Sequence, residues 1–224
     1  MLEISDLKVF LQDPELKASI DEIWDSVGQA FVDEQANLPR EDAMTRKELS
    51  FHDHVKFLGY LCWLITHSNA AGDIIEIGNW KGKSIAFMHH VCQKQRRVIG
   101  VDPQVLPNQD KELTFYRDRI FPEVTLIRGF SELSIERVLA LEPKTVLLHI
   151  DGGHLAKHVF MDFFLYSPTV VTGGFIVFDD YRDHRYSPEV GPAVDLLRAG
   201  GHFNAFDVIG SVPGFENSYL LQKK

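Results

Sequence analysis

The stretch DIIEIGNWKGKS, residues 73–84, joins a short apolar run to a glycine-containing turn, and a helix-like segment follows it. Three further apolar runs each end in an acid: Arg97–Asp102, Thr145–Asp151 and Gly174–Asp180. Near-continuous apolar runs are typical of strands that are buried on both faces of a parallel sheet. Open α/β sheets bind their ligands at the carboxyl ends of their strands. We therefore expect one crevice lined by four carboxylates: Asp102, Asp151, Asp179 and Asp180.

Strand-like and helix-like segments alternate along most of the chain. We expect strands at 73–78, 97–102, 124–128, 145–151 and 174–179, and helices at 82–94, 109–119, 132–140, 155–165 and 190–199. Repeated βα units build a parallel sheet with helices on both faces. After Gly200–Gly201, residues 202–209 and 218–222 follow each other without a helix, which predicts a closing antiparallel hairpin. The predicted fold class is therefore α/β, with a doubly wound, mostly parallel sheet.

The first fifty residues have a different pattern. Apolar side chains recur every three or four residues over residues 14–32, which predicts an amphipathic helix. The polar stretch that follows, residues 33–49, indicates a mobile connector or lid. Ser50 and Asp53 have the spacing of a capping box, so a second helix is expected to begin there. We divide the chain into two parts: an amino-terminal helix and connector, residues 1–50, and an α/β domain, residues 51–224.

Composition and charge argue against several classes of protein. The 224 residues are 45% hydrophobic and 25% charged, as expected for one globular domain, and the net charge of −9 argues against a nucleic-acid partner. We expect no membrane partner and a cytoplasmic location, because no apolar run could span a bilayer and no signal-peptide pattern opens the chain. Cys62 and Cys92 are expected to be reduced core thiols. The apolar face of helix 14–32 could cover its own core or a partner chain, so a homo-oligomer stays open.

The turn after the first strand does not fit the common nucleotide-binding motifs. Trp80 occupies the position of the middle glycine of the dinucleotide fingerprint, and the turn is one residue too short for a P-loop. A helix that begins near Gly82 offers free N–H groups to a carboxylate, Ser84 adds a hydroxyl, and Glu76 could hold an ammonium group. An amino-acid moiety carries both of these charges. The alternative is that Gly78 and Gly82 only form a tight turn, with Ser84 as a helix cap.

Asp102 ends the second strand, where an acid commonly binds the hydroxyl groups of a ribose. A nucleoside joined to an amino acid without any phosphate is S-adenosylmethionine, and its sulfonium suits an acidic crevice. Ser131 could bond the edge of the adenine, and Phe130 could pack on the ring. The alternatives are that Asp102 is a solvated acid before the turn at Pro103, and that Ser131 is an ordinary helix cap.

Asp151, Asp179 and Asp180 come from the ends of two neighbouring strands. Carboxylates that lie this close repel one another unless a cation lies among them. Mg²⁺ binds oxygen ligands and usually keeps several waters, so these three acids predict a magnesium site. The alternative is that Asp179 and Asp180 only begin a polar loop and that Asp151 caps a helix. His154 follows Asp151 by three residues and has the right chemistry for a general base near neutral pH. The alternative for His154 is a residue at a helix start without a catalytic role.

Three segments carry a resemblance to a known family: EIGNWKGKS at 76–84, HIDGGH at 149–154 and GGFIVFDDY at 173–181. In them the chain resembles the class I S-adenosylmethionine-dependent methyltransferases, and more narrowly the metal-dependent, macrocin O-methyltransferase-like enzymes of antibiotic-sugar tailoring. The resemblance covers about residues 45–222. It implies a Rossmann-like, seven-stranded sheet with a reversed last strand, magnesium at the three acids, and a base at His154. Many relatives carry an acid where Gly153 stands. This chain lacks that second candidate base, so the role of base rests more on His154.

The sequence therefore predicts a magnesium- and S-adenosylmethionine-dependent O-methyltransferase. Its acceptor would be a hydroxyl group of a small molecule, such as a sugar or another natural product. One alternative is an NAD-dependent oxidoreductase on the same fold, against which Trp80 argues. The other is a non-catalytic cofactor-binding protein, against which the intact set of three acids argues.

Overall fold

A computed structural model describes residues 9, 11–45, 49, 55–68, 70–93, 95–212 and 214–224. The helices are α2 (Pro14–Gln35), α3 (Lys56–His67), α4 (Lys83–Val91), α5 (Gln109–Ile120), α6 (Ser131–Leu139), α7 (Ala156–Tyr166) and α8 (Val190–Ala199). The strands are β1 (Asp73–Ile77), β2 (Val98–Asp102), β3 (Thr125–Arg128), β4 (Thr145–Ile150), β5 (Val170–Phe178), β6 (Phe206–Val212) and β7 (Phe215–Lys223). The expected capping box at Ser50 and Asp53 lies outside the described residues.

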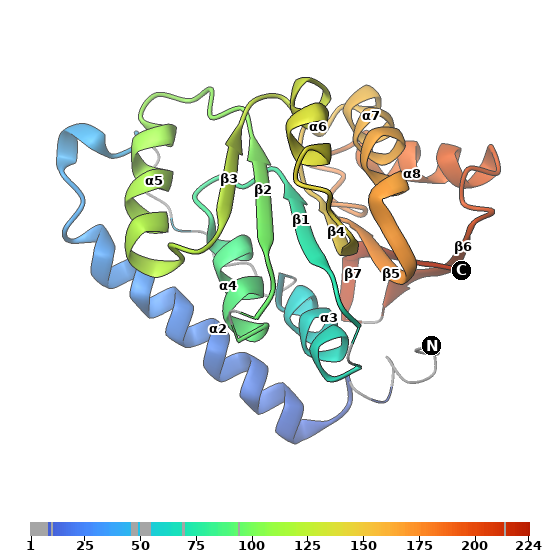
Figure 1. Ribbon diagram of the computed structural model, residues 1–224, viewed down its shortest axis with the longest axis horizontal. Helices are drawn as coiled ribbons and strands as arrows, with labels where there is room; N and C mark the ends of the chain where they lie inside the picture. Colours follow the sequence, from blue (N-terminus) through green and yellow to red (C-terminus); the bar gives the residue numbers. More distant parts are fainter. Residues whose placement is uncertain are drawn as a thin grey trace.

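The strands form a seven-stranded sheet with the order β3-β2-β1-β4-β5-β7-β6 (Figure 1). The first five strands pair in parallel, whereas β7 runs antiparallel to both β5 and β6. This topology confirms the predicted doubly wound sheet with a reversed last strand. Because β1, β4 and β5 are neighbours, their carboxyl ends meet at one edge of the sheet.

Helices cover both faces of the sheet (Figure 1). Alternate strand residues point to opposite faces, so Ile74 joins the core under α2–α5 whereas Ile75 joins the core under α6–α8. Cys62 and Cys92 are buried in the first of these cores and are not disulfide-bonded, as expected. In the described part of the chain, every helix is too short or too polar to cross a membrane.

Helix α2 packs lengthwise on α4 and α5. Asp13 caps its first turn by accepting from the N–H groups of Glu15 and Leu16. The face expected to be apolar is buried in this chain's own core, where Trp24 meets the ring of Phe87 edge-on at 4.9 Å between centroids. The packing of this helix, more than its intrinsic propensity, therefore holds it in place.

The connector after α2 lies against α5 as far as the structure follows it. Asn108 donates from Nδ2 to the carbonyl oxygens of Glu41 and Ala43, at 2.9 and 3.1 Å. The N–H of Met44 donates to Oε2 of Glu112 at 2.7 Å, and the Met44 side chain is buried. Up to Thr45 this segment is thus fixed on α5, unlike the mobile connector that its composition predicts.

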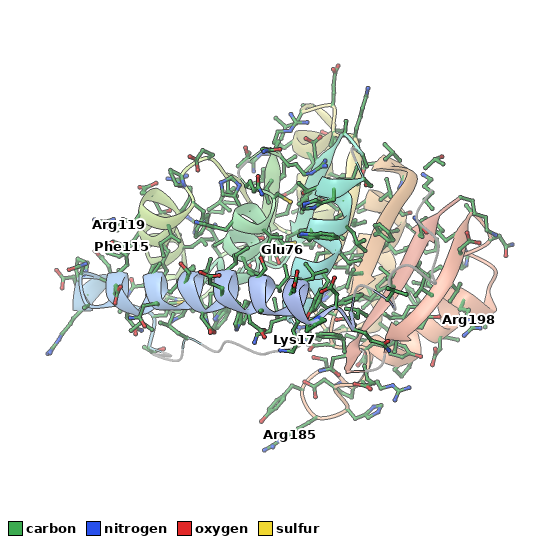
Figure 2. All side chains as sticks on the ribbon, turned by 90° about the horizontal axis from the view of Figure 1, so that it is seen from below. Lys17, Glu76, Phe115, Arg119, Arg185 and Arg198 are labelled. Atoms are coloured by element: carbon green, nitrogen blue, oxygen red, sulfur yellow. The ribbon has the colours of Figure 1, made fainter. Side chains whose placement is uncertain are left out.

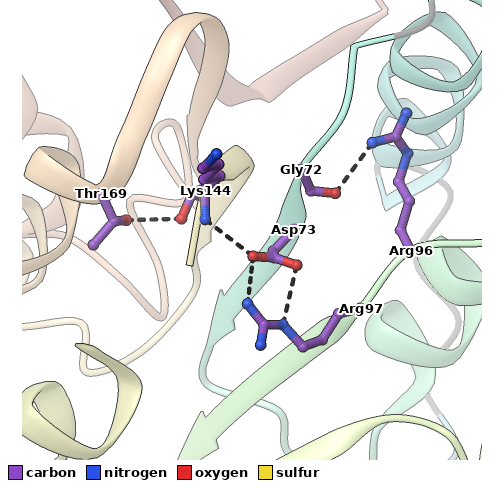
Figure 3. A network of polar contacts seen from close by, with 7 residues as sticks. Gly72, Asp73, Arg96, Arg97, Lys144 and Thr169 are labelled. Atoms are coloured by element: carbon purple, nitrogen blue, oxygen red, sulfur yellow. Dashed lines mark hydrogen bonds and ion pairs between the residues drawn. The ribbon is translucent and has the colours of Figure 1, made fainter. Parts of the chain in front are cut away.

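A polar network ties the amino ends of three strands together (Figure 3). The guanidinium group of Arg97 binds both carboxylate oxygens of Asp73, at 3.0 and 2.7 Å. One of these oxygens also accepts from the backbone N–H of Lys144, at 3.0 Å. Asp73 begins β1, Arg97 precedes β2 and Lys144 precedes β4, so the network fixes the relative register of these strands. That register in turn sets where their carboxyl ends lie.

Two strands begin four residues away from their predicted starts, the largest differences among the strand boundaries. Strand β5 begins at Val170, four residues earlier than expected, and its first part continues through a shift in register opposite β4. Strand β6 begins at Phe206, because residues 201–205 form turns after α8 instead of joining the sheet. Glycines and polar residues in these two stretches interrupt the apolar pattern from which strand starts are predicted.

We predict that Trp24→Ala lowers the free energy of unfolding by about 3–5 kcal/mol, the usual cost of truncating a large buried aromatic residue. Val32→Ala, on the same helix but 50% exposed, should change it by less than about 0.5 kcal/mol. Urea denaturation followed by circular dichroism measures both values. Equal effects of the two substitutions would contradict the packing of α2 described above.

Candidate active site

Asp151 and Asp179 directly follow β4 and β5 and extend the backbone ladder by one bond each. The N–H of Asp151 donates to the carbonyl of Ile77 at 2.9 Å, and the N–H of Asp179 donates to that of Ile150 at 3.0 Å. Asp180 has a left-handed backbone conformation, with a φ of 58°, so the chain turns sharply there. The acids therefore lie where the sheet ends and where side chains no longer alternate regularly between its two faces.

The acids form two groups that share Asp151. In one group, ligand atoms of His149, Asp151 and Asp179 all lie within 4.8 Å of one another. In the other group, the same holds for Asp151, His154 and Asp180. Of the three predicted metal ligands, Asp151 therefore belongs to both groups, whereas Asp179 belongs only to the first and Asp180 only to the second.

Electrostatics at Asp151 favour a cation. Burial, followed by the nearby carboxylates of Asp179 and Asp180, raises the pKa of Asp151 well above its ordinary value. Each of these groups offers oxygen atoms, which are the ligands preferred by hard divalent cations. The residues present therefore fit a divalent metal ion.

His154 is held by two residues of the loop after β5. Its Nδ1 lies 2.8 Å from the Ser187 hydroxyl, and this hydroxyl donates to Oδ2 of Asp180 at 2.6 Å. Because Ser187 uses its proton for Asp180, it accepts from a protonated Nδ1, which leaves Nε2 as the basic nitrogen. Nε2 lies 3.4 Å from Oδ2 of Asp180, and the His154 side chain is 43% exposed. This arrangement suits a base that meets a substrate from outside.

The structure explains why Gly153 stands between Asp151 and His154. A Cβ atom at this position would lie 2.0 Å from Nδ1 of His158. The His158 ring, on α7, occupies the space into which an acidic side chain would extend. No side chain therefore competes with His154 at this position.

A cavity of about 330 Å³ opens beside His154. It lies between the loop after β4 and the loop before α8, and its lining is Gly152, Gly153, His154, Leu155, His158, Tyr186, Pro188 and Glu189. Apolar and aromatic side chains are thus combined with two histidines and one acid. Such a lining is typical of a site for a small organic molecule.

The turn after β1 requires both of its glycines. Gly78 has a φ of 91°, and a Cβ there would lie 1.9 Å from the carbonyl oxygen of Asp151. Gly82 has a φ of 86° and precedes α4, and a Cβ there would lie 2.5 Å from the Phe121 ring. Gly82 is the N-cap residue of α4, and no side-chain hydrogen bond caps the helix there in the described residues. Ser84, in the first turn of α4, is half-buried. The helix start therefore keeps N–H groups for an anion.

Asp102 fixes this turn from the neighbouring strand. One carboxylate oxygen accepts from the N–H groups of Asn79 and Trp80, at 2.9 and 3.0 Å. The other oxygen accepts from the N–H of Gln104 and from Nε2 of Gln109, at 2.7 and 3.0 Å. Burial raises the pKa of Asp102 despite these bonds. A ribose would have to replace one of the glutamine contacts, so the predicted sugar-binding role remains a prediction.

Glu76 is fully buried and contacts a residue that the sequence argument did not consider. Its Oε1 lies 2.9 Å from Nδ1 of His149, its direct neighbour on β4. In Figure 2, Glu76 lies inside the molecule, whereas Arg185 projects from its rim. An ammonium group at Glu76 would have to share this carboxylate with His149.

Ser131 and Phe130 stand at the start of α6. The Ser131 hydroxyl donates to Oδ1 of Asp162, a buried acid of α7, and the Tyr166 hydroxyl donates to the Ser131 carbonyl at 2.8 Å. Burial raises the pKa of Asp162 to about 6. Phe130 is 50% exposed. The sequence argument missed Asp162, because only the packing of α6 on α7 brings it to Ser131.

Comparisons with known proteins agree with this geometry. Residues 75–181 match a family described as a methyltransferase domain. The chain is 36% identical over 149 residues to the uncharacterized protein R132 of Acanthamoeba polyphaga mimivirus, a match that covers 62% of this chain and 67% of R132.

Two solved structures share the fold. The O-methyltransferase NovP has a TM-score of 0.60 at 17% identity, over 77% of this chain and 80% of NovP. The methyltransferase MycE, in complex with Mg, SAH and mycinamycin VI, has a TM-score of 0.50 at 17% identity, over 69% of this chain and 45% of MycE. The fold, the glycine turn and the domain match agree with one another: residues 75–181 match a methyltransferase domain, and the sheet has the fold of the O-methyltransferase NovP.

Proposed function

We propose that the protein transfers the methyl group of S-adenosylmethionine to a hydroxyl oxygen of a small molecule, with a divalent cation at Asp151. The observation that carries the proposal is the crowding of Asp179 and Asp180 around Asp151, directly beside the oriented base His154. Activating a hydroxyl group needs both a base and a positive charge near the oxygen. NovP, an O-methyltransferase, and MycE, seen with Mg and SAH, support the choice of acceptor atom and ion.

S-adenosylmethionine would supply a methyl group on a positively charged sulfur, and the cation would stabilise negative charge on the acceptor oxygen. His154 accepts the hydroxyl proton on Nε2, and the electron pair of the O–H bond stays on the oxygen. Nδ1 keeps its proton and continues to donate to Ser187. Because Ser187 in turn donates to Asp180, the positive imidazolium is linked to a negative carboxylate.

The cofactor would lie along the carboxyl ends of β1, β2 and β3. Its carboxylate would meet the uncapped N–H groups of α4 with the help of Ser84. The adenine would stack on the exposed ring of Phe130, close to Ser131. The domain match supports this cofactor over NAD, and so does Trp80, which has a φ of 46° and stands where the dinucleotide fingerprint has its middle glycine.

The acceptor would enter through the cavity beside His154. Leu155, Tyr186 and Pro188 give this cavity apolar walls, and Glu189 gives it an acidic group. Tyr186 is 69% exposed, and the guanidinium carbon of Arg185 lies over its ring at 4.9 Å from the centroid, so a sugar or another ring would stack on the opposite face. A hydroxylated natural product of modest size suits this combination of groups.

We predict that S-adenosylhomocysteine stabilises the protein and that NAD does not. At one hundred times its dissociation constant, a ligand that binds only the folded state adds about 2.7 kcal/mol to the free energy of unfolding. Phe130→Ala should weaken the cofactor about tenfold, because base stacking on an aromatic ring contributes about 1–3 kcal/mol. Leu139→Ala is the matched control, since Leu139 is also 50% exposed but ends α6. Thermal unfolding with each ligand tests this prediction, and stabilisation by NAD alone would contradict it.

We predict that His154→Gln lowers methyl transfer to a panel of catechols and hexoses by at least about 10²-fold, as loss of a general base does. Ser187→Ala should lower the rate of methyl transfer less, because it removes only the hydrogen bond that orients the His154 ring. The exposed His202 provides the control His202→Gln, which should leave the rate unchanged. S-adenosylhomocysteine formation is measured by mass spectrometry. An unchanged rate in His154→Gln would assign the base to another residue.

A further inference from the structure

Two buried side chains of α7 hold the first residue of α6, the helix that lies beside it (Figure 1). Asp162 and Tyr166 are four residues apart on α7, so their side chains lie on the same face of that helix. The Tyr166 hydroxyl donates to the carbonyl oxygen of Ser131 at 2.8 Å. The Ser131 hydroxyl donates to Oδ1 of Asp162. Helix α7 therefore fixes both the backbone and the hydroxyl group of Ser131.

The second carboxylate oxygen of Asp162 faces the loop after β4. A Cβ atom at Gly152 would lie 3.0 Å from Oδ2 of Asp162, so only a glycine leaves this oxygen its full space. Gly152 directly follows Asp151 and brings no charge to Asp162. The buried carboxylate thus lies at the carboxyl edge of the sheet, between the start of α6 and the cluster of acids.

Asp162 can only accept a hydrogen bond from Ser131 at neutral pH. Burial raises the pKa of Asp162 to about 6, the bond from Ser131 opposes this rise, and the charge of Glu132 adds to it. Because this pKa lies below neutrality, the carboxylate has no proton to donate. Oε2 of Glu132, at 3.4 Å from the Ser131 hydroxyl, is a more distant acceptor. The Ser131 proton therefore faces carboxylate oxygens and is bound to Asp162.

This bond decides what Ser131 offers to a ligand. A serine hydroxyl has one proton to donate and two lone pairs that accept. With the proton bound to Asp162, only the lone pairs of Ser131 are left, and its side chain is half-buried beside the exposed Phe130. A lone pair binds an N–H group and repels a carbonyl oxygen. The start of α6 is thus built to distinguish an amino group on a ring from a carbonyl group.

We propose that Asp162 is a positioning residue that keeps Ser131 in its accepting orientation, so that the protein selects a purine with an amino group at position 6. Adenine carries this amino group, whereas hypoxanthine and guanine carry a carbonyl oxygen there. This inference rests on S-adenosylmethionine as the cofactor of the proposed function, and it does not depend on the cation or on the acceptor. Asp162 acts through Ser131 and contacts no ligand itself.

The test compares S-adenosylhomocysteine with S-inosylhomocysteine, in which the carbonyl of hypoxanthine replaces the amino group of adenine. Isothermal titration of the full-length protein at pH 7.5 gives both affinities. We expect S-adenosylhomocysteine to bind at least about tenfold more tightly, because a lone pair that faces a carbonyl oxygen leaves two acceptors unsatisfied. Asp162→Asn should reduce this preference to about threefold or less, since an asparagine amide can donate to Ser131 and release its proton. The exposed Glu136 of α6 provides the control Glu136→Gln, which should keep the full preference.

A double-mutant cycle separates this role from a merely structural one. Ser131→Ala should also remove the preference, and Asp162→Asn added to Ser131→Ala should change it no further, because the two residues act as one unit. If Asp162→Asn does not fold, Ser131→Ala and the wild-type protein at pH 5 still decide, since protonation of Asp162 should lower the preference in the same way.

Equal binding of the two ligands by the wild-type protein at pH 7.5 would overturn the inference. So would a full preference in Asp162→Asn or in Ser131→Ala. Failure of S-adenosylhomocysteine to bind the wild-type protein would instead overturn the cofactor of the proposed function.

Discussion

Repulsion among carboxylates at one edge of the sheet is the constraint on which the active site depends. Folding places Asp151, which is half-buried at the end of β4, beside Asp179 and Asp180, which both follow the neighbouring strand β5. Desolvation, followed by the negative charges of Asp179 and Asp180, raises the pKa of Asp151, so the protein without a cation holds these groups together at a cost. The network of Asp73, Arg97 and Lys144 at the opposite ends of the strands fixes the register that enforces this proximity. A cation bound there, as we propose, would convert this cost into binding free energy.

The turn after β1 packs directly against the backbone of Asp151, one of the clustered acids. Gly78 lies so close to the carbonyl of Asp151 that no side chain fits between them. Asp102 holds the other side of the same turn through the N–H groups of Asn79 and Trp80. A shift of β4 would therefore move the proposed metal ligands and the turn after β1 together. Positioning to within a fraction of an ångström matters in methyl transfer, because the attacking oxygen must meet the methyl group in line.

The sequence predicted those parts of the site that follow from strand periodicity. Asp102, Asp151 and Asp179 stand at strand ends because apolar runs end there, and parallel strands bring those ends together. Ser187 could not be predicted, since its contact with His154 depends on the path of an irregular loop. His149 did leave a signal: a histidine inside the apolar run TVLLHI needs a buried partner.

Pairing His149 with Glu76 required the strand order, in which β1 and β4 are neighbours although more than sixty residues separate them. Asp162 likewise reaches Ser131 only through the packing of α7 on α6. Local patterns thus place residues on elements, whereas contacts between distant elements decide which of them act together. The connector before Thr45 illustrates the same limit, because its polar composition concealed its contacts with α5.

The central claim is that Asp151 holds a divalent cation next to the methyl donor. A crystal grown with MnCl₂ and S-adenosylhomocysteine, measured at the manganese absorption edge, tests it most directly. The account predicts an anomalous peak at coordination distance from the Asp151 carboxylate, with the sulfur of the cofactor nearby. A map without a peak there, in which the aspartate side chains point apart into solvent, would contradict it.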